Sequence, residues 1–186
     1  MIANAGVSFG TLTGRDGDVA VIERILQTNV VATAATFAPF IAPMKAQAAA
    51  GARDLRLVGI ASVAGIRGLP GAEAYSASKA AVISYCESLR VELRSQGIRV
   101  VTIAPGYIDT PMTRVNTYRM PFLMPAARFA RSAVRVIAAG RSYAVIPWPM
   151  RIVSWALRLM PNWLFDAAFA RAPHKPSVQD IEGRSS

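Results

Sequence analysis

Short apolar runs alternate along this chain with longer segments of helical periodicity, and this alternation restricts the fold more than any other feature. Three runs have the length of buried strands: 54–62, 98–104 and 141–146. Three segments have helical spacing: 18–50, 74–95 and 125–139. Strands that alternate with helices are typical of a parallel sheet covered by helices on both faces. The sequence therefore predicts an α/β fold with a doubly wound, Rossmann-like parallel sheet.

Composition argues against several classes of function. Just over half of the 186 residues are hydrophobic, which is enough for one core. The single cysteine, Cys86, excludes an intrachain disulfide and is interpreted as a packed side chain. With one histidine, His174, and carboxylates that do not cluster, the sequence predicts no metal site. A serine hydrolase would also lack a general base for its serine. The net charge is +10, but the arginines are dispersed without a dense block, so we expect no nucleic-acid partner.

Tyr75 and Lys79 stand four residues apart in the predicted helix 74–95, which sets their side chains side by side. A free tyrosine loses its proton near pH ~10. A neighbouring ammonium favours the phenolate and lowers that pKa, so the tyrosine can exchange a proton with a carbonyl or an alcohol. Tyrosine and lysine at this spacing are more often surface neighbours than a catalytic pair. The surrounding segments decide between these two interpretations.

Two predicted strands end beside this pair. Ser62 closes the run 54–62, and Pro105-Gly106 follows the run 98–104. In open parallel sheets, ligands bind at the carboxyl ends of the strands. A proline–glycine turn there also lets the backbone approach a flat ligand closely. The sequence therefore predicts a ligand site at this edge.

The combination resembles the short-chain dehydrogenase/reductase family, over residues 1 to about 149. The family motifs occur in family order: Asn4-Ala5-Gly6, then Ser62, then Tyr75 with Lys79, then Pro105-Gly106 with Thr110. Asn29, in the long first helix, matches a further family asparagine. As a combination these motifs are highly specific.

The resemblance implies an oxidoreductase that moves a hydride between NAD or NADP and a small-molecule carbonyl or secondary alcohol. Tyr75 would be the acid-base, and Lys79 would lower its pKa and hold the nicotinamide ribose. Ser62 would bind the substrate oxygen, and Asn29 would kink its helix and position a water that links Lys79 to solvent. The implied cofactor-binding residues, besides Tyr75 and Lys79, are Asn4, Ala5, Gly6, Pro105, Gly106, Ile108 and Thr110, with the Ile108 backbone and Thr110 side chain at the carboxamide.

One family feature is missing from the sequence. Members begin with a strand, a TGxxxGxG turn and a helix that hold the cofactor pyrophosphate, and no such segment precedes Asn4. We therefore expect that the first βαβαβ half of the sheet is absent. The residues that would select between NAD and NADP are then absent as well. The chain as given is expected not to be a competent dehydrogenase. Three explanations stay open: a start codon assigned too late, a truncated gene product, and a noncatalytic remnant that acts as a binding or scaffold protein. The late start is favoured. Gly65, Gly68 and Gly71 are spaced GxxGxxG and predict only a flexible loop.

Bulky residues follow Thr110 where the family has its substrate loop. Those assigned to this loop are Met112, Tyr118, Met120 and Phe122. They suggest an apolar substrate pocket. An ordinary packed helix is an equally weighted alternative.

Residues 150–172 form an apolar and basic helical segment after the catalytic part, 1–149. Arg151, Ser154 and Arg158 share one helical stripe, and three tryptophans recur along the segment. It is too short to span a bilayer, which needs ~20 apolar residues. It could lie in a membrane interface, but packing on the substrate pocket or another subunit is the favoured interpretation. The polar tail 173–186 is predicted to be disordered or a cloning scar, since Ile181-Glu182-Gly183-Arg184 has the form of a protease site.

Assembly and location are expectations from the same features. In the family, the helices matching 18–50 and 74–95 form a four-helix dimer core, and both are rich in alanine here. We therefore expect a homodimer or homotetramer. Nothing at the amino terminus resembles a signal peptide, which predicts a cytoplasmic protein, with a peripheral membrane location as the alternative.

Overall fold

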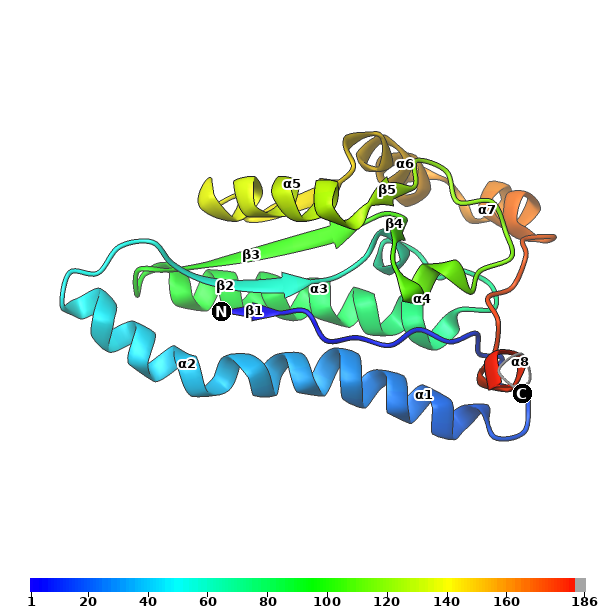
Figure 1. The fold of residues 1–186 in the computed structure, drawn as a ribbon, viewed down its shortest axis with the longest axis horizontal. Coiled ribbons are helices and arrows are strands. Elements are labelled where there is room, and N and C mark those ends of the chain that lie inside the picture. Colours follow the sequence, from blue (N-terminus) through cyan, green and yellow to red (C-terminus); the bar gives the residue numbers. More distant parts are fainter. Residues whose placement is uncertain (183–186) are drawn as a thin grey trace.

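A computed structural model describes residues 1–182, and Figure 1 shows a parallel sheet at its centre. The strands are β1 (Ile2–Ala3), β2 (Leu55–Ile60), β3 (Ile98–Pro105) and β6 (Tyr143–Ile146), in the order β1-β2-β3-β6. All three pairings are parallel. The predicted α/β fold is confirmed. Gly183 and Arg184 of the protease-like motif lie outside the described residues.

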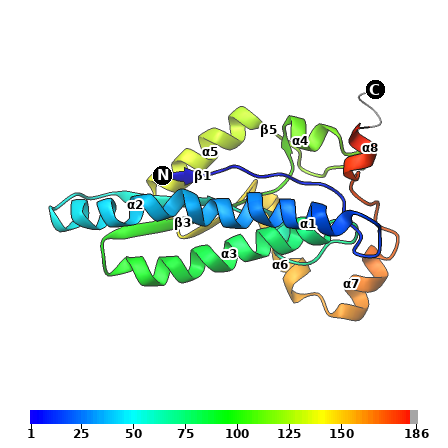
Figure 2. The ribbon, with the colours of Figure 1, turned by 90° about the horizontal axis from the view of Figure 1, so that it is seen from below.

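Helices cover both faces of the sheet (Figures 1 and 2). On one face lie α1 (Asp18–Leu26), α2 (Ala32–Ala49) and α3 (Glu73–Arg94), and on the other lies α5 (Ala126–Ala138). Phe37 of α2 and Val82 of α3 pack with Leu57 from the strands. Ala133 of α5 packs with Val101 on the opposite face. Because both faces are buried, the central strands are apolar at nearly every position.

Shorter elements follow the carboxyl end of β3. They are β4 (Ile108–Asp109), α4 (Pro111–Arg114) and β5 (Met124–Pro125), and β4 pairs with β5 in a separate two-stranded sheet. After β6 come α6 (Trp148–Leu159), α7 (Asn162–Phe169) and α8 (Val178–Glu182). The 3₁₀ turn Val63–Gly65 connects β2 toward α3.

Cys86 is a packed side chain, as expected. It is fully buried, and burial raises the pKa of its thiol to about 11, so it is a poor nucleophile at neutral pH. Its sulfur occupies the space that a Cβ at Gly59 of β2 would need, because that Cβ would lie 2.5 Å from the sulfur. The glycine and the cysteine together let α3 approach the sheet.

The long helix Asp18–Ala49 has an apolar composition and a largely exposed outer face. It is the one helix within residues 1–182 that is long and apolar enough to cross a membrane. A core helix of a soluble protein passes the same test, and this helix packs on the sheet through Phe37. Its exposed alanines are compatible with the expected dimer face, and the dimer stays a prediction.

The tail contacts the loop after β1. Residues 173–182 pack across this loop, since the Gly10 amide donates to the Pro176 carbonyl at 2.8 Å. A Cβ on Gly10 would lie 2.0 Å from the Lys175 carbonyl oxygen, and one on Gly71 would lie 2.6 Å from the His174 ring. These contacts place a segment that has no apolar periodicity of its own, and the expectation of a disordered tail or a cloning scar stays a prediction.

Candidate active site

A cavity of about 600 Å³ lies at the carboxyl ends of β1, β2 and β3, beside the first turns of α3. The predicted residues that line it are Asn4, Ala5, Gly6, Ser62, Tyr75, Lys79, Pro105, Gly106, Ile108, Thr110 and Met112. From α5 come Ala126, Phe129 and Ala130. The convergence follows from topology, because parallel strands present all their carboxyl ends at one edge.

Lys79 is buried and held at the end of β2. Its ammonium donates to the Ile60 carbonyl at 3.0 Å and lies 5.9 Å from the centre of the Tyr75 ring. Burial lowers the pKa of Lys79 to about 8. Within residues 1–182 the ammonium makes this one hydrogen bond, so two of its three N–H groups remain as donors.

The pKa of Tyr75 differs in direction from the expectation. Burial raises the pKa of the Tyr75 hydroxyl, and a hydrogen bond with Ser62 opposes this rise. Burial is thus the larger effect on the Tyr75 pKa, and the lowering expected from the Lys79 ammonium, which lies 5.9 Å from the centre of the ring, stays a prediction.

Ser62 is the residue that caps the 3₁₀ turn after β2. Its hydroxyl accepts a hydrogen bond from the Ala64 amide at 3.1 Å. That contact fixes the side-chain oxygen at the strand end, where it also pairs with Tyr75. The serine thus has both a structural contact and a position on the cavity wall.

Asn29 lies behind the cavity in a π-helical turn, Gln27–Val31, between α1 and α2. Its amide oxygen accepts from the Val7 amide at 2.8 Å, and its nitrogen donates to the Val7 carbonyl and to the Ser78 hydroxyl, at 3.0 and 2.9 Å. A π-helical turn is a frequent feature of functional sites. Asn29 therefore ties the loop after β1 to the helix that carries Tyr75, while the expected water relay stays a prediction.

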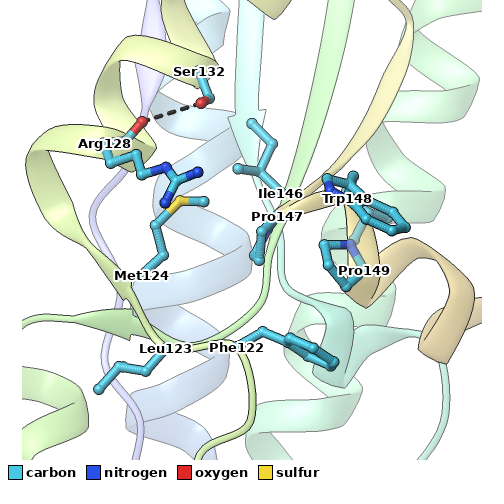
Figure 3. Close-up of a pocket in the computed structure, with 10 residues that line it drawn as sticks. Phe122, Leu123, Met124, Arg128, Ser132, Ile146, Pro147, Trp148 and Pro149 are labelled. Atoms are coloured by element: carbon cyan, nitrogen blue, oxygen red, sulfur yellow. Dashed lines mark hydrogen bonds between the residues drawn. The ribbon is translucent and has the colours of Figure 1, made fainter.

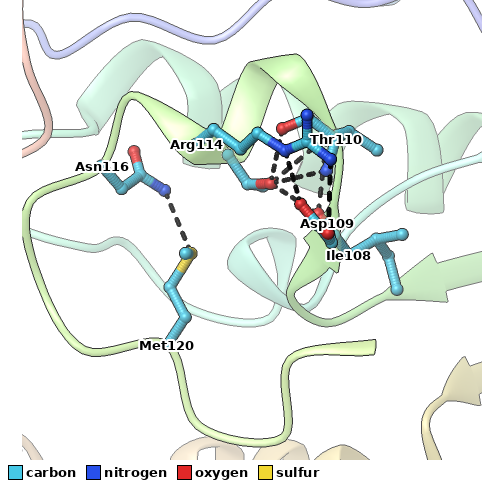
Figure 4. Close-up of polar contacts among 7 residues, drawn as sticks. Ile108, Asp109, Thr110, Arg114, Asn116 and Met120 are labelled. Carbon is cyan, nitrogen blue, oxygen red and sulfur yellow. Dashed lines mark hydrogen bonds and ion pairs between the residues drawn. The ribbon is translucent and has the colours of Figure 1, made fainter. Parts of the chain in front are cut away.

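The turn after β3 is organised by its own side chains (Figure 4). The Thr110 and Thr113 hydroxyls form a reciprocal capping box on α4, and Thr113 also donates to the Ile108 carbonyl at 2.5 Å. Asp109 pairs with Arg114 at 2.7 Å. The Thr110 hydroxyl is thus engaged in the helix cap in addition to facing the cavity.

Gly106 lies against α6. A Cβ there would lie 2.7 Å from the Met150 side chain and 3.4 Å from Pro147. The missing side chain therefore makes room for α6, and the expected close approach of a flat ligand stays a prediction. Its backbone still lines the cavity.

The predicted substrate loop divides between two places. Met112 lines the cavity, whereas Tyr118 packs edge-on against Tyr107 with ring centres 6.4 Å apart. The Met120 sulfur accepts from the Asn116 amide at 3.6 Å (Figure 4). Phe122 lines a second cavity, of about 450 Å³, together with Trp148 and Arg128 (Figure 3). These three residues lie beyond α4, which ends at Arg114, so the packed-helix alternative is wrong, whereas their assignment to a substrate loop that closes over a ligand stays a prediction.

The glycine-containing loop after Ser62 is anchored rather than merely flexible. A Cβ on Gly65 would lie 2.6–2.8 Å from backbone atoms of Lys79 and Ala80. Gly71 has a φ of +68° and packs against His174. Gly68, between them, faces open space. The expectation of a simple flexible loop is wrong at its two ends.

Lys175 was missed by sequence reasoning. Its ammonium lies 5.3 Å from the centre of the Tyr75 ring, and burial lowers its pKa to about 8. It stands a hundred residues after the tyrosine in a segment without periodicity. No signal in the sequence points to this contact, which depends on the backbone bonds that order the tail.

The lowered lysine pKa values give a testable pH dependence. Between about pH 8 and the ordinary value near ~10.4, the folded protein binds fewer protons at Lys79 and Lys175 than the unfolded chain. Burying each ammonium lowers the free energy of unfolding. This penalty is fully present below pH 8 and decreases as the pH rises through this range. NMR of 13C-labelled lysine should show both side chains titrating near pH 8, and midpoints near 10 for both would contradict this.

Comparison with known proteins identifies the group to which this geometry corresponds. Residues 1–120 match the family model described as short chain dehydrogenase. Over 171 residues the chain is 38% identical to an uncharacterized oxidoreductase of Myxococcus xanthus, a match that covers 92% of this chain and 65% of that protein. The chain thus spans less than two thirds of that relative.

Two solved structures have a similar fold. A short chain dehydrogenase from Burkholderia cenocepacia in complex with NADP has a TM-score of 0.76 at 21% identity, and the match covers 92% of this chain and 68% of that one. A 3-ketoacyl-(acyl-carrier-protein) reductase from Brucella melitensis complexed with NADH has a TM-score of 0.66 at 23% identity, with 77% and 62% covered.

Proposed function

Because the chain belongs to the short-chain dehydrogenase family, we propose that it carries the catalytic residues of an NAD(P)-dependent oxidoreductase that interconverts a carbonyl group and a secondary alcohol. The observation that supports this most strongly is the single cavity lined by Ser62, Tyr75 and Lys79 at the strand ends. NAD(P) follows from the family and from the NADP and NADH named for the two structural neighbours.

The residues present fit a nicotinamide group. The cavity has Asn4 to Gly6 on one side and Pro105 to Thr110 on the other. Lys79 keeps two N–H donors that could bind ribose hydroxyls. A Cβ on Gly6 would lie 3.4 Å from the Lys79 ammonium, so the glycine keeps that approach clear.

In the proposed reduction, a reduced nicotinamide held between these residues would supply the hydride for the carbonyl carbon. The Tyr75 hydroxyl gives its proton to the carbonyl oxygen, and its oxygen keeps the electron pair. The Ser62 hydroxyl holds the substrate oxygen beside Tyr75, and the Lys79 ammonium stabilises the resulting phenolate. The raised pKa of Tyr75 suits the donor role, because the hydroxyl stays protonated until the oxygen of the substrate acquires charge.

The cavity wall supports an apolar substrate. Met112, Ala126 and Phe129 contribute apolar surface to its lining. Methionine adapts to irregular shapes, so a bulky ketone fits this wall better than a sugar does.

Saturation-transfer NMR of the 186-residue chain with NADH and NADPH tests the proposal. The cavity residues would contact the nicotinamide end of the cofactor, and the 186 residues contain no TGxxxGxG turn. We therefore expect weak binding, with stronger saturation transfer to the nicotinamide protons than to the adenine protons. Lys79→Met should reduce this transfer, whereas Lys45→Met, on the exposed part of α2, should not.

The opposite pattern would reject the proposal. Equal saturation transfer to the nicotinamide and adenine protons would favour the noncatalytic binding or scaffold alternative. Saturation transfer that Lys79→Met leaves unchanged would favour it as well. Circular dichroism of each variant separates loss of binding from loss of fold.

A further inference from the structure

The two helices after β6 carry large apolar side chains that are exposed. They are Trp148, Ile152, Trp155 and Leu159 of α6 with Trp163 and Leu164 of α7, which are together named the tryptophan face. The four α6 residues recur at intervals of four, three and four, so they share one side of the helix. The three tryptophans are 69%, 70% and 71% exposed, and they are all the tryptophans of the chain. Large aromatic side chains in such a cluster indicate an interaction site.

The tryptophan face is held in place by the opposite sides of the two helices. Met150 and Ser154 of α6 and Phe165 of α7 are buried. Arg67 donates to the carbonyls of Leu157, at 3.0 Å, and Met160, and its guanidinium lies 4.1 Å from the centre of the Phe165 ring. The inner side thus packs on other parts of the same chain, whereas packing on the substrate pocket or another subunit stays a prediction. The packing of the inner side leaves the tryptophans directed outward on a fixed support.

Arginines border the tryptophan face. Arg151 and Arg158 are exposed and directly precede Ile152 and Leu159. Arg128 lies with Trp148 around the cavity in Figure 3. None of the twelve residues of α6 is acidic. Arg151, Ser154 and Arg158 line one groove, as their predicted shared stripe requires, and the buried Ser154 hydroxyl donates to the Met150 carbonyl at 2.8 Å.

We propose that the tryptophan face binds the surface of a membrane containing anionic lipid. Tryptophan rings prefer the headgroup region, and arginines beside them pair with lipid phosphates. Helix α6, with twelve residues, is far shorter than the ~20 needed to span, so it lies in the interface. This inference does not depend on the proposed reaction.

The charge pattern favours lipid over a second copy of the chain. A two-fold interface places the same face on both partners, which would bring Arg151 and Arg158 of both copies together. The carboxylate beside them, Glu87, shares a groove with both arginines and already lies 3.9 Å from Arg90. Phosphate groups of lipid would instead match the arginines.

Tryptophan fluorescence and vesicle flotation test the proposal. Because all three tryptophans lie on this face, adding phosphatidylcholine vesicles with phosphatidylglycerol should shift the emission of the 186-residue chain to shorter wavelength. The chain should also float with these vesicles, at least ten-fold more than with pure phosphatidylcholine. Trp148→Ser with Trp155→Ser should reduce flotation at least ten-fold.

Two further double variants serve as controls for the flotation experiment. Val91→Ser with Val134→Ser removes two exposed apolar residues from α3 and α5 and should leave flotation unchanged. Arg151→Glu with Arg158→Glu should abolish the preference for anionic vesicles. Unfolding curves check that each variant is folded.

Three results would overturn the proposal. These are no flotation of the wild type, flotation that the tryptophan pair does not reduce, or a concentration-dependent dimer in sedimentation that disappears in the tryptophan variant. The last result would assign the face to a second copy of the chain.

Discussion

Tyr75→Phe should reduce turnover by about 10²–10⁴-fold, which is the usual contribution of a positioned acid-base group. The substitution removes only the hydroxyl and keeps the ring, against which the ammonium groups of Lys79 and Lys175 lie at 5.9 and 5.3 Å. Affinity for NAD(P)H should therefore change little. The measurement is kcat for reduction of a ketone, with cofactor binding followed by titration, in a form of the protein that turns over.

The matched control for this prediction is Tyr143→Phe. Tyr143 lies on β6, is exposed, and is absent from the cavity lining. It should retain full turnover. A Tyr75→Phe enzyme with wild-type kcat would show that the proton comes from another group.

Gly65→Val should destabilise the fold by about 3 kcal/mol, at the upper end of the usual cost of overpacking. Any Cβ at this position would lie 2.6–2.8 Å from the backbone of Lys79 and Ala80 in α3. Backbone atoms cannot rotate away as a flexible side chain can, so the turn and the helix must separate. Urea unfolding of the two proteins measures the difference in free energy.

The same substitution should also disturb the site. The 3₁₀ turn that ends at Gly65 begins directly after Ser62. Moving the turn away from α3 moves Ser62 away from Tyr75, and the hydrogen bond between them should weaken. A tyrosine titration should then show whether the Tyr75 pKa rises, because that hydrogen bond is what opposes the effect of burial.

Gly68→Val is the matched control, since a Cβ at Gly68 would have nothing within 4 Å. It should unfold at nearly the wild-type urea concentration. If both valine variants lose the same stability, the effect comes from loop entropy and the close contact at Gly65 is not its cause.

Local pattern alone determined the architecture and the position of the site. The period of the apolar residues separated strands from helices, and parallel strands necessarily end at one edge. This placed Ser62 and the Pro105–Thr110 turn together. The four-residue interval between Tyr75 and Lys79 put both on one side of α3. These inferences depend on local patterns and on the common edge at which parallel strands end.

Tertiary packing decided the electrostatics of the site. The direction of the Tyr75 pKa is set by burial, which depends on every element around the ring. The second ammonium, from Lys175, arrives through contacts between the tail and Gly10 that no periodicity encodes. The loop residues Tyr118, Met120 and Phe122 form no regular element, and Phe122 lies beside Trp148, a residue distant in sequence that no local pattern could indicate.

Tertiary packing also decided why particular residues are required. The sequence places Gly106 in a turn, but only the position of Met150 shows what its missing side chain accommodates. The sequence likewise marks α6 as amphipathic, but only the contacts of Met150, Ser154 and Arg67 select which side is buried. A helical period fixes which residues share a face, whereas the surface that covers that face belongs to other parts of the chain.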